Sequence, residues 1–376
     1  MSISITSAFD SGNIRVVSIS DTGTGVRAEL EIVKDRQSDF YQWFHFRVAG
    51  VAGREVELAI VNCGTSAYPD GWPGYQARFS EDRENWLLAH TGYADGTLTI
   101  RLSPDSNAVW LAYFAPYSME RHHDLVAWAA SQPGVQHREL GLTLDRQPLD
   151  LLVLGDGPKK VWLYARQHPG ESMAEWWMEG ALERLCDEED AVARLLRREA
   201  TFHIVPNMNP DGSRRGHLRT NAVGINLNRE WHDPSLEKSP EVFLVRRAMD
   251  EVGVDFAMDV HGDEAIAAVF LAGFEGIPSI TERQSTLYRR YCDTLAARTP
   301  DFQTKKGYPA TPPGRANLSM STNQLAERFG AVAMTLEMPF KDNDDLPDAD
   351  FGWSPARSIQ LAKDCLGVLA EMIDDI

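Results

Sequence analysis

The chain has 376 residues, and its composition, 43% hydrophobic and 24% charged, is typical of a globular protein that folds in water. The formal net charge of -18 excludes nucleic acid as a partner, because no broad basic surface is available to neutralise phosphates. No segment approaches the ~20 apolar residues of a membrane span, and the N-terminus lacks the basic and apolar regions of a signal peptide. We therefore expect a cytoplasmic protein without membrane association, long enough for two domains.

The four cysteines are scattered along the chain and include no Cys-x-x-Cys pair. This spacing predicts free, buried thiols in a reducing compartment, not a disulfide framework. The residues are Cys63, Cys186, Cys292 and Cys365.

The first part of the chain, residues 1–115, has the pattern of β structure. Short runs of alternating hydrophobic and polar residues are separated by clusters of Gly, Pro, Asp and Ser, which predicts an N-terminal antiparallel β-sandwich domain. The clearest runs cover residues 26–33, 43–49, 55–62, 97–102 and 108–114.

The pattern changes after residue 115. A helix is expected at 118–131, and nearly continuous apolar runs, as in strands buried on both faces, then alternate with helical segments. This predicts a catalytic α/β domain over 116–376, with a mixed, mainly parallel central sheet flanked by helices. The expected strands cover 150–155, 161–166, 200–206, 254–260, 267–273 and 331–338, and the expected helices 172–199, 239–252, 278–298 and 354–373.

Side chains that can bind a metal or transfer a proton follow several of these apolar runs. His168 and Glu171 come after one strand, His261 ends another, and Glu337 lies at the end of a third. In open α/β sheets ligands bind beyond the carboxyl ends of the strands, so these side chains are expected to meet. Two histidines and one glutamate with an open fourth position make a catalytic zinc site. Glu337 then remains as the carboxylate that a hydrolase needs to move a proton.

A second group of polar residues lies in LRTNAVGINLNREW, residues 218–231. Arg219 and Arg229 are ten positions apart, Asn228 adjoins the second, and the abundance of Gly and Asn predicts a loop. Arginine forks bind carboxylates, so beside zinc they would hold an anionic substrate end or an oxyanion.

Taken together, these motifs resemble those of the zinc metallocarboxypeptidases. HPGE, VPNMNPDG, RTNAVGINLNREW, DVHG and TLEMPF occur in the order seen in that family. Carboxypeptidase A is itself a standard example of a His2Glu zinc site. In the N-terminal part, WFHFRV and AYFAPYS are similar to the β-sandwich and boundary motif of the cytosolic carboxypeptidase subfamily, and the chain looks like a bacterial member of it.

The resemblance implies hydrolysis of the last peptide bond of a peptide or protein with one zinc ion per chain. His168, Glu171 and His261 would be the zinc ligands, and Glu337 the general base and acid. Arg219 would polarise the scissile carbonyl. Asn228 and Arg229 would bind the C-terminal carboxylate of the substrate.

Two residues of the family pattern have no clear counterpart. Tyr308 is the favoured candidate for a tyrosine that covers the terminal residue, with Tyr288 and Tyr291, in an expected helix, as the alternatives. Arg315 is the candidate for a basic residue in the side-chain pocket, with Lys305 and Lys306 as weaker choices. Eukaryotic relatives that remove glutamates use basic residues there, so a preference for acidic C-terminal residues is one hypothesis.

Two other functions are compatible with these motifs. A zinc-dependent N-acyl amino acid amidohydrolase would use the same metal site and also needs a carboxylate clamp. A binding protein with a retained zinc pocket would be favoured by a missing ligand or base, but all four of those residues are present.

Overall fold

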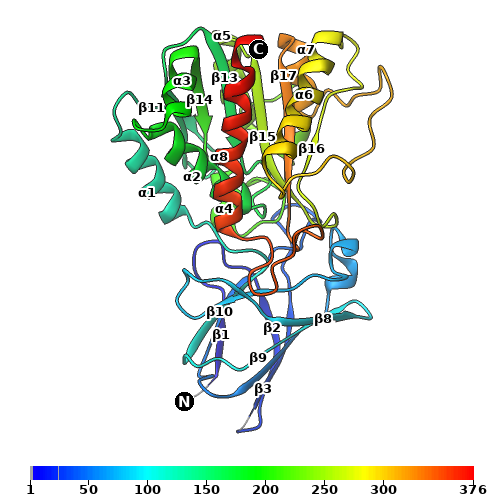
Figure 1. Ribbon diagram of the computed structural model, residues 1–376. Coiled ribbons are helices and arrows are strands. Elements are labelled where there is room, and N and C mark those ends of the chain that lie inside the picture. Colours follow the sequence, from blue (N-terminus) through cyan, green and yellow to red (C-terminus); the bar gives the residue numbers. More distant parts are fainter. Residues whose placement is uncertain (1–2, 24) are drawn as a thin grey trace.

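The computed structural model in Figure 1 describes residues 3–23 and 25–376. Within these residues three sheets form, two of five strands from the N-terminal part and one of seven strands from the rest. The break between them falls between β10 (Ala108–Ala112) and β11 (Gln136–Leu142), a stretch that also holds helix α1 (Met119–Ala130). Figure 1 shows the two smaller sheets below the large sheet, on one side of the molecule. The expected domain boundary at residue 115 lies in this stretch and stays a prediction.

The two N-terminal sheets have the strand orders β1-β4-β10-β6-β7 and β2-β3-β5-β9-β8. Their antiparallel character is confirmed, except that β3 and β5 pair in parallel. In β3 the residues Val26, Ala28 and Leu30 are buried and the residues between them are exposed, as alternation predicts. Besides β10, the strands are β1 (Ser4–Thr6), β2 (Arg15–Asp21), β3 (Gly25–Glu31), β4 (His45–Ala49), β5 (Glu55–Ile60), β6 (Arg78–Ser80), β7 (Leu87–Leu88), β8 (His90–Ala94) and β9 (Thr97–Leu102).

The seven-stranded sheet has the order β11-β12-β14-β13-β15-β17-β16. Its four central strands, β14, β13, β15 and β17, pair in parallel, and the strands at both edges, β11 and β12 on one side and β16 on the other, pair antiparallel. Every residue of β15 and β17 is buried, which explains their unbroken apolar character. The predicted mixed α/β fold is confirmed. The bounds are β12 (Pro148–Leu154), β13 (Lys159–Ala165), β14 (Ala200–Val205), β15 (Phe256–Asp263), β16 (Phe270–Ala272) and β17 (Val332–Pro339).

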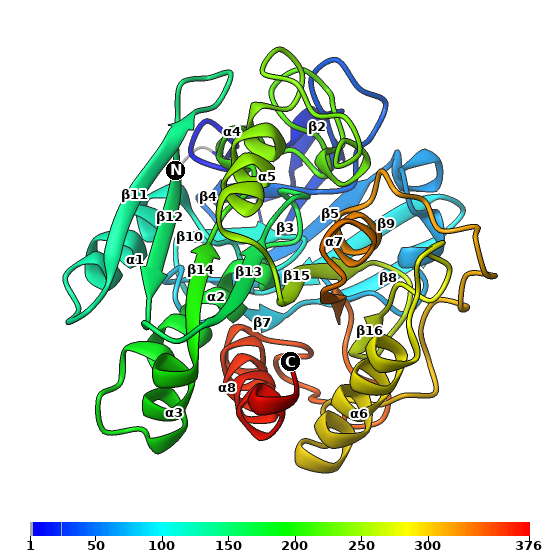
Figure 2. The same cartoon turned by 90° about the horizontal axis from the view of Figure 1, so that it is seen from above.

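Helices cover both faces of this sheet. Figure 2 shows α2, α3, α6 and α8 along one face and α5 and α7 over the other. The helices are α2 (Met173–Cys186), α3 (Ala191–Glu199), α4 (Pro210–Arg215), α5 (Pro240–Val252), α6 (Glu282–Arg298), α7 (Ser321–Phe329) and α8 (Pro355–Met372), with short 3-10 turns at Cys63–Thr65, Pro69–Gly71, Leu227–Arg229 and Ile373–Asp375.

The segment 172–199 was expected to be one helix, and this was wrong. Asp190 ends the pattern by accepting hydrogen bonds from the backbone N–H groups of Val192 (2.6 Å) and Ala193 (3.0 Å), so a new helix begins there. An acidic N-cap satisfies donors that a continuous helix would not leave free. Helix α7 was not expected, because its polar sequence STNQLAERF has little apolar periodicity.

Within the described residues no helix is both long and apolar enough to cross a membrane. The four cysteines are free thiols, as expected, and Cys292 alone among them is only partly buried.

Candidate metal centre and active site

Parallel pairing brings the predicted ligands to one edge of the large sheet. His168 and Glu171 lie on the turn after β13, which pairs with β15, where His261 is found. His261 in turn lies opposite Glu337 in the register of β15 and β17. Because the carboxyl ends of parallel strands meet at the same edge, residues far apart in the sequence become neighbours.

The donor atoms of His168, Glu171 and His261 all lie within 4.8 Å of one another. The Nδ1 atoms of the two rings are 3.1 Å apart, and each lies 2.7 Å from an oxygen of Glu171. The three side chains are buried, with at most 4% of any of them exposed. This spacing is close enough for one small cation to contact all three donors.

The outer nitrogen of each ring has its own acceptor. His168 Nε2 lies 3.1 Å from Asn226 Oδ1, and His261 Nε2 lies 2.8 Å from Asp259 Oδ1. An amide oxygen and a carboxylate beside Nε2 favour a proton on that nitrogen, and each neutral ring would then present the lone pair of Nδ1. Two such lone pairs and a carboxylate facing one another repel unless a cation lies between them. The residues therefore fit a metal of the His2Glu type.

The protonation behaviour of this cluster points the same way. Burial, helped by Arg219, lowers the pKa of His168 to about 4, so its ring is in the neutral form that binds metals. Burial works against ionisation of Glu171, but the two histidines outweigh it and hold its pKa below the usual value. Burial also opposes a charge on His261, yet Asp259 and Glu171 raise its pKa well above normal. The carboxylates thus favour a positive charge in the cluster, which a bound metal ion would supply.

Asp259 is fixed behind His261 by two donors. Gln167 Nε2 donates to Asp259 Oδ2 at 2.6 Å, and the Ser321 hydroxyl donates to the same oxygen. Gln167 is oriented in turn by Trp231, whose Nε1 donates to its amide oxygen at 2.7 Å. Such outer contacts set the orientation of a ligand ring.

The turn that carries His168 and Glu171 is held from behind by Arg166. The Arg166 guanidinium donates to the carbonyl of Pro169 from Nε (3.2 Å) and Nη2 (2.7 Å), and to the carbonyl of Tyr117 at 2.9 Å. Arg166 itself has φ +56, in the left-handed region that only a few per cent of non-glycine residues occupy. Tertiary contacts therefore impose the turn.

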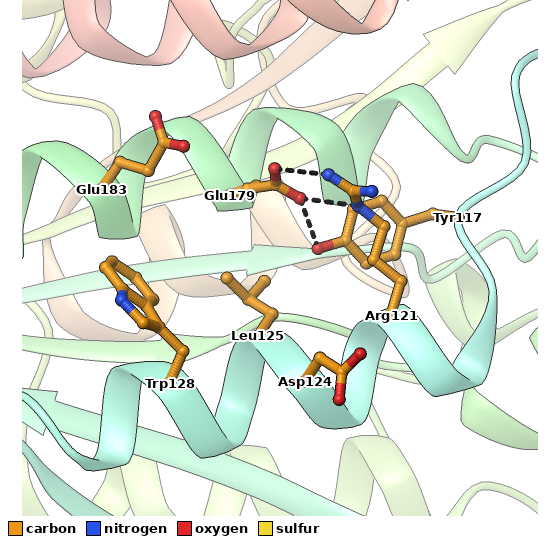
Figure 3. A pocket seen from close by; sticks show the side chains of 7 residues that line it. All are labelled: Tyr117, Arg121, Asp124, Leu125, Trp128, Glu179 and Glu183. Carbon is orange, nitrogen blue, oxygen red and sulfur yellow. Dashed lines mark hydrogen bonds and ion pairs between the residues drawn. The ribbon is translucent and has the colours of Figure 1, made fainter. Parts of the chain in front are cut away.

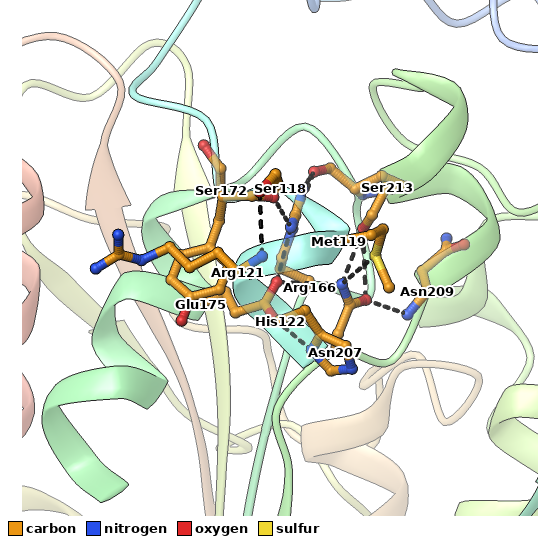
Figure 4. Close-up of polar contacts among 12 residues, drawn as sticks. Ser118, Met119, Arg121, His122, Arg166, Ser172, Glu175, Asn207, Asn209 and Ser213 are labelled. Carbon is orange, nitrogen blue, oxygen red and sulfur yellow. Dashed lines mark hydrogen bonds and ion pairs between the residues drawn. The ribbon is translucent and has the colours of Figure 1, made fainter. Parts of the chain in front are cut away.

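Glu175 balances the charge of Arg166, and the two are at most 1% exposed. Its carboxylate accepts from Arg166 Nη1 (2.7 Å), contacts His122 Nδ1 (2.6 Å) and accepts from Asn207 Nδ2 (3.1 Å). Figure 4 shows these side chains converging on Glu175. His122 also lies 3.4 Å from Asp150, so positive and negative groups alternate through the cluster. We name Arg166, Glu175, His122 and Asn207 the turn-supporting cluster.

Glu337 is buried beside the donors and has unused hydrogen-bonding capacity. Its Oε2 has no partner among the described residues, and its Oε1 accepts only a long 3.4 Å bond from the Tyr308 hydroxyl. Burial raises the pKa of Glu337 well above normal, against the opposing effect of His261 and with the help of Glu171 and other nearby carboxylates. A carboxylate with a raised pKa and a free oxygen is suited to accept a proton from a water molecule.

The structure separates the three candidate tyrosines. Tyr308 reaches the site, because its hydroxyl donates to Asp263 Oδ2 at 2.7 Å and to Glu337, while half of the residue stays exposed. Tyr288 and Tyr291 are buried on α6 and donate to the carbonyls of Leu271 and Cys365, so they do not lie at the site.

Arg219 presents its guanidinium without a polar partner among the described residues. The group lies over the rings of Phe40 (5.6 Å) and Tyr68 (5.3 Å), both from loops of the N-terminal part. Burial lowers its pKa, but Tyr68, Glu171 and other acidic groups outweigh this and raise it, so the side chain stays charged. Its five N–H donors therefore remain free for an anion.

Asn228 and Arg229 lie at the same place. The backbone N–H of Ser321 donates to Asn228 Oδ1 at 2.9 Å, so the amide NH2 points elsewhere and has no partner among the described residues. Arg229 is exposed, and within the described part of the chain its guanidinium donates only to the carbonyl of Asn228 (2.6 Å). Partial burial of the guanidinium lowers the pKa of Arg229, and the positive charge of Arg219 lowers it further. Arginines and an amide without an acidic partner are the kind of donors that bind carboxylates, so the predicted role of these residues stays a prediction.

Among the described residues, the candidate basic residues for the side-chain pocket form no hydrogen bond or ion pair with these groups. Arg315 is exposed and its side chain forms no hydrogen bond or ion pair among the described residues, although its backbone N–H donates to the carbonyl of Pro312 at 3.0 Å. Lys306 pairs with Asp344 (3.2 Å) and Lys305 is exposed. Their role stays a prediction.

Comparison with known proteins shows the family. A model of the cytosolic carboxypeptidase N-terminal domain matches residues 5–114, and a model of zinc carboxypeptidase matches residues 123–250. A metallo-carboxypeptidase from Pseudomonas aeruginosa, solved in complex with (2-guanidinoethylmercapto)succinic acid, is 44% identical with a TM-score of 0.96 over 99% of both chains. The chain belongs to the zinc carboxypeptidase family. It is a peptidase, a hydrolase with metallocarboxypeptidase chemistry.

Two other relatives differ in how much of their own length matches this zinc carboxypeptidase. An uncharacterized protein of Zymomonas mobilis is 62% identical over the whole chain and 98% of its own length. Human cytosolic carboxypeptidase 4 is 29% identical over 71% of this chain, and the match spans only 28% of the human protein. The zinc carboxypeptidase model ends at residue 250, so it includes neither His261 nor Glu337.

Two acidic residues of this carboxypeptidase were missed at the site. Asp263 and Glu264 lie two and three positions after His261 in DVHGDE and are 8% and 6% exposed. Asp263 accepts from Tyr308, and burial together with Glu171 raises the pKa of Glu264 well above normal. The acidic residues after the histidine are visible in the sequence, but the sequence does not show in which direction their side chains point.

A separate cavity of about 390 Å³ lies between α1 and α2 of this carboxypeptidase. Figure 3 shows that Arg121 in this cavity is engaged by Glu179, with bonds of 2.8 and 3.0 Å. The guanidinium also stacks 4.1 Å from the ring of Trp176. None of the predicted site residues lines the cavity, so it is distinct from the metal centre.

Proposed function

We propose that this zinc carboxypeptidase hydrolyses the C-terminal peptide bond of peptides or proteins, using the residues predicted from the sequence. The observation that carries the proposal is the position of uncompensated cationic donors next to a cluster of metal donors. Arg219 and Arg229 have no acidic partner among the residues that the structure describes, and an anionic chain end would provide one.

The metal would be held by His168, Glu171 and His261, one zinc ion per chain. When bound there, zinc supplies Lewis acidity for the attacking water and for the scissile carbonyl. Glu337 Oε2, which has no other partner, would take a proton from the water and return it to the departing amine.

Arg219 would stabilise the negative charge that develops on the carbonyl oxygen. Its aromatic neighbours keep the guanidinium desolvated, and donors that face a developing charge in such a site lower the barrier most. Asn228 and Arg229 would hold the terminal carboxylate. The free amide of Asn228 supports this assignment, because its other end is already bonded to Ser321.

Tyr308 would cover the terminal residue of the substrate. Its hydroxyl is tied to Asp263 and Glu337, and half of the residue is exposed, so it can exchange those partners for substrate. Cytosolic names among the relatives support a cytoplasmic place of action.

The proposed preference for acidic C-terminal residues rests on Arg315 and on the resemblance to eukaryotic deglutamylating members. A profile with peptides ending in Glu, Asp, Lys, Arg, Phe or Leu tests it, since an Arg315 pocket requires faster cleavage of Glu and Asp ends. The relative from Pseudomonas aeruginosa was solved with a compound that bears a guanidino group, so basic ends belong in the same panel.

N-acyl amino acids are the alternative substrates, because they also present a carboxylate to Arg229 and Asn228. The deciding measurement is a comparison of kcat/KM for peptides, for N-acyl amino acids and for peptides with an amidated C-terminus. Carboxypeptidase activity requires turnover of free-acid peptides and loss of turnover on amidation. Turnover of acyl amino acids alone would establish the amidohydrolase instead.

A further inference from the structure

The loop that carries Arg219 is hydrogen-bonded to one carboxylate of the N-terminal part of the chain. Asp35 accepts hydrogen bonds from three consecutive backbone N–H groups, those of Leu218 (2.7 Å), Arg219 (2.9 Å) and Thr220 (2.9 Å). The Thr220 hydroxyl adds a fourth bond at 3.0 Å. Asp35 is only 2% exposed, so these bonds to a charged acceptor are shielded from water.

The same N-terminal segment also supplies one of the rings that flank Arg219. The Asp35 N–H donates to the carbonyl of Phe40 at 2.8 Å, which closes residues 35–40 into a compact turn. The turn therefore holds the backbone of Arg219 with Asp35 and its guanidinium with Phe40. A change in the position of this turn moves both ends of the arginine together.

The second ring that flanks Arg219, that of Tyr68, is also held in place by hydrogen bonds. The Gln42 side chain forms two hydrogen bonds with the backbone of Tyr68. Its Nε2 donates to the Tyr68 carbonyl (3.0 Å), and its Oε1 accepts from the Tyr68 N–H (2.8 Å). The Tyr68 ring then lies 5.3 Å from the Arg219 guanidinium. Cation–π contacts of this kind fix the direction of a guanidinium without using its N–H donors.

The arginine loop is also linked to the turn that carries the metal donors. Gly170 donates its N–H to the Leu218 carbonyl at 2.9 Å, and a Cβ at Gly170 would lie 2.9 Å from that oxygen. The two backbones therefore touch, and only glycine permits this distance. Asp35 thus holds one side of the loop while the metal-donor turn holds the other.

We propose that Asp35 is a positioning residue of the active site, through which the N-terminal domain sets the Arg219 guanidinium in place for the reaction. This inference rests on the proposed role of Arg219 as the group that faces the developing oxyanion. Asp35 touches neither the metal donors nor Glu337, so its effect passes through the backbone of residues 218–220.

Asp35 could also serve only to hold two parts of the chain together, and Asp10 is a residue that does this away from the arginine loop. Asp10 accepts a hydrogen bond from the backbone N–H of Met119 at 3.0 Å, so it also joins the N-terminal part to the rest. Asp10 has no contact with the arginine loop among the described residues. Asp10→Asn is therefore the matched control for Asp35→Asn.

The experiment measures the kcat and KM of the zinc-loaded protein on its best peptide, with zinc content and amide hydrogen exchange of residues 217–224. Asp35→Asn is expected to lower kcat about 100-fold with little change in KM. A misplaced Arg219 guanidinium would stabilise the transition state less while substrate binding changes little. Exchange of residues 218–220 should become faster while zinc content stays equal to that of the wild type. Asp10→Asn should leave kcat and this exchange unchanged.

Combining Asp35→Asn with Arg219→Ala distinguishes the positioning role of Asp35 from the proposed catalytic role of Arg219. If Asp35 acts through Arg219, adding Asp35→Asn to Arg219→Ala lowers kcat by less than about threefold more. An undiminished further loss, unchanged exchange, or unchanged kcat in Asp35→Asn would overturn the positioning role. Full activity of Arg219→Ala would instead contradict the proposed function.

Thr220→Val provides a second variant if Asp35→Asn does not fold. It removes only the hydroxyl bond to Asp35 and should lower kcat several-fold, again only when Arg219 is present. Equal losses with and without Arg219 would assign Asp35 a purely structural role.

Discussion

His261 and Glu337 lie opposite each other in the register of two adjacent parallel strands, β15 and β17. One belongs to the cluster of metal donors and the other has a carboxylate oxygen without a partner. The pairing places the proposed base beside the proposed metal without a loop between them. Sites built on paired strands hold their geometry better than sites on loops.

Removing the carboxylate of Glu337 should separate metal binding from catalysis. Glu337→Gln is expected to keep one zinc per chain and to lose ~10²–10⁴-fold in kcat, because the amide cannot accept the proton. Metal analysis and steady-state kinetics on the same preparation check this. Glu251→Gln, at an exposed position of α5, is the control and should behave as the wild type. Full activity of Glu337→Gln would exclude Glu337 as the base.

Loss of a histidine donor should abolish metal binding. His168→Ala and His261→Ala are each expected to contain far less than one zinc per chain after dialysis, because two donors are insufficient for a structural or catalytic site. Elemental analysis measures this directly. His123→Ala changes an exposed histidine and should retain the metal. Wild-type zinc content in either donor variant would contradict the assigned ligand set.

Arg166 should affect metal affinity without contacting the metal. Arg166→Lys loses the paired bonds to the Pro169 carbonyl, so the turn that carries His168 and Glu171 is less well ordered. We expect zinc affinity to fall about 10–100-fold, as for other residues that support ligands from behind. Competition with a chelator measures the affinity. Arg121→Lys, in the cavity between α1 and α2, should leave it unchanged, and an equal loss in both variants would refute the specific role of Arg166.

The buried histidine of the turn-supporting cluster should make stability depend on pH. Burial alone would lower the pKa of His122, but Glu175 and Asp150 outweigh it and raise the pKa to about 9. A histidine whose pKa is higher in the folded state contributes its full stability below its unfolded pKa near 6.5. The contribution is lost as pH rises through the folded value. Stability from this group should therefore decline between about pH 6.5 and pH 9, by roughly 3 kcal/mol.

Denaturant unfolding of the wild type and His122→Gln across this pH range tests the prediction. The difference in unfolding free energy between them should be largest near pH 6 and should shrink towards pH 9, because only the wild type carries the titrating charge. A difference that stays constant over the range would show that His122 does not hold a proton in the folded state. His137→Gln, half-exposed at the same Asp150, serves as the comparison variant.

Much of the site could be predicted because its residues follow buried strands. An apolar run that ends in a histidine or glutamate marks a strand end, and parallel strands collect their ends at one edge. This local pattern was sufficient for His168, Glu171, His261 and Glu337 to be named. The chemistry of Arg219, Asn228 and Arg229 was visible in the same way, since a Gly- and Asn-rich segment with arginines predicts an anion-binding loop.

Other features depend on contacts between segments far apart in the chain, which residue patterns do not encode. Nothing around Asp35 indicates that its carboxylate accepts from residues 218–220, and Phe40 and Tyr68 look like ordinary aromatic residues. The choice among Tyr308, Tyr288 and Tyr291 likewise required the direction of each side chain.

The sequence by itself determined the strand-end donors, the α/β class and the type of chemistry, because hydrophobic periodicity and residue type are local properties. Only the tertiary structure decided which groups are left without partners. The lone pairs of the two histidines, the free oxygen of Glu337 and the unpaired guanidinium of Arg219 are identified by what packs around them. That information lies in three-dimensional contacts, where burial and pairing set the charge and reactivity of each side chain.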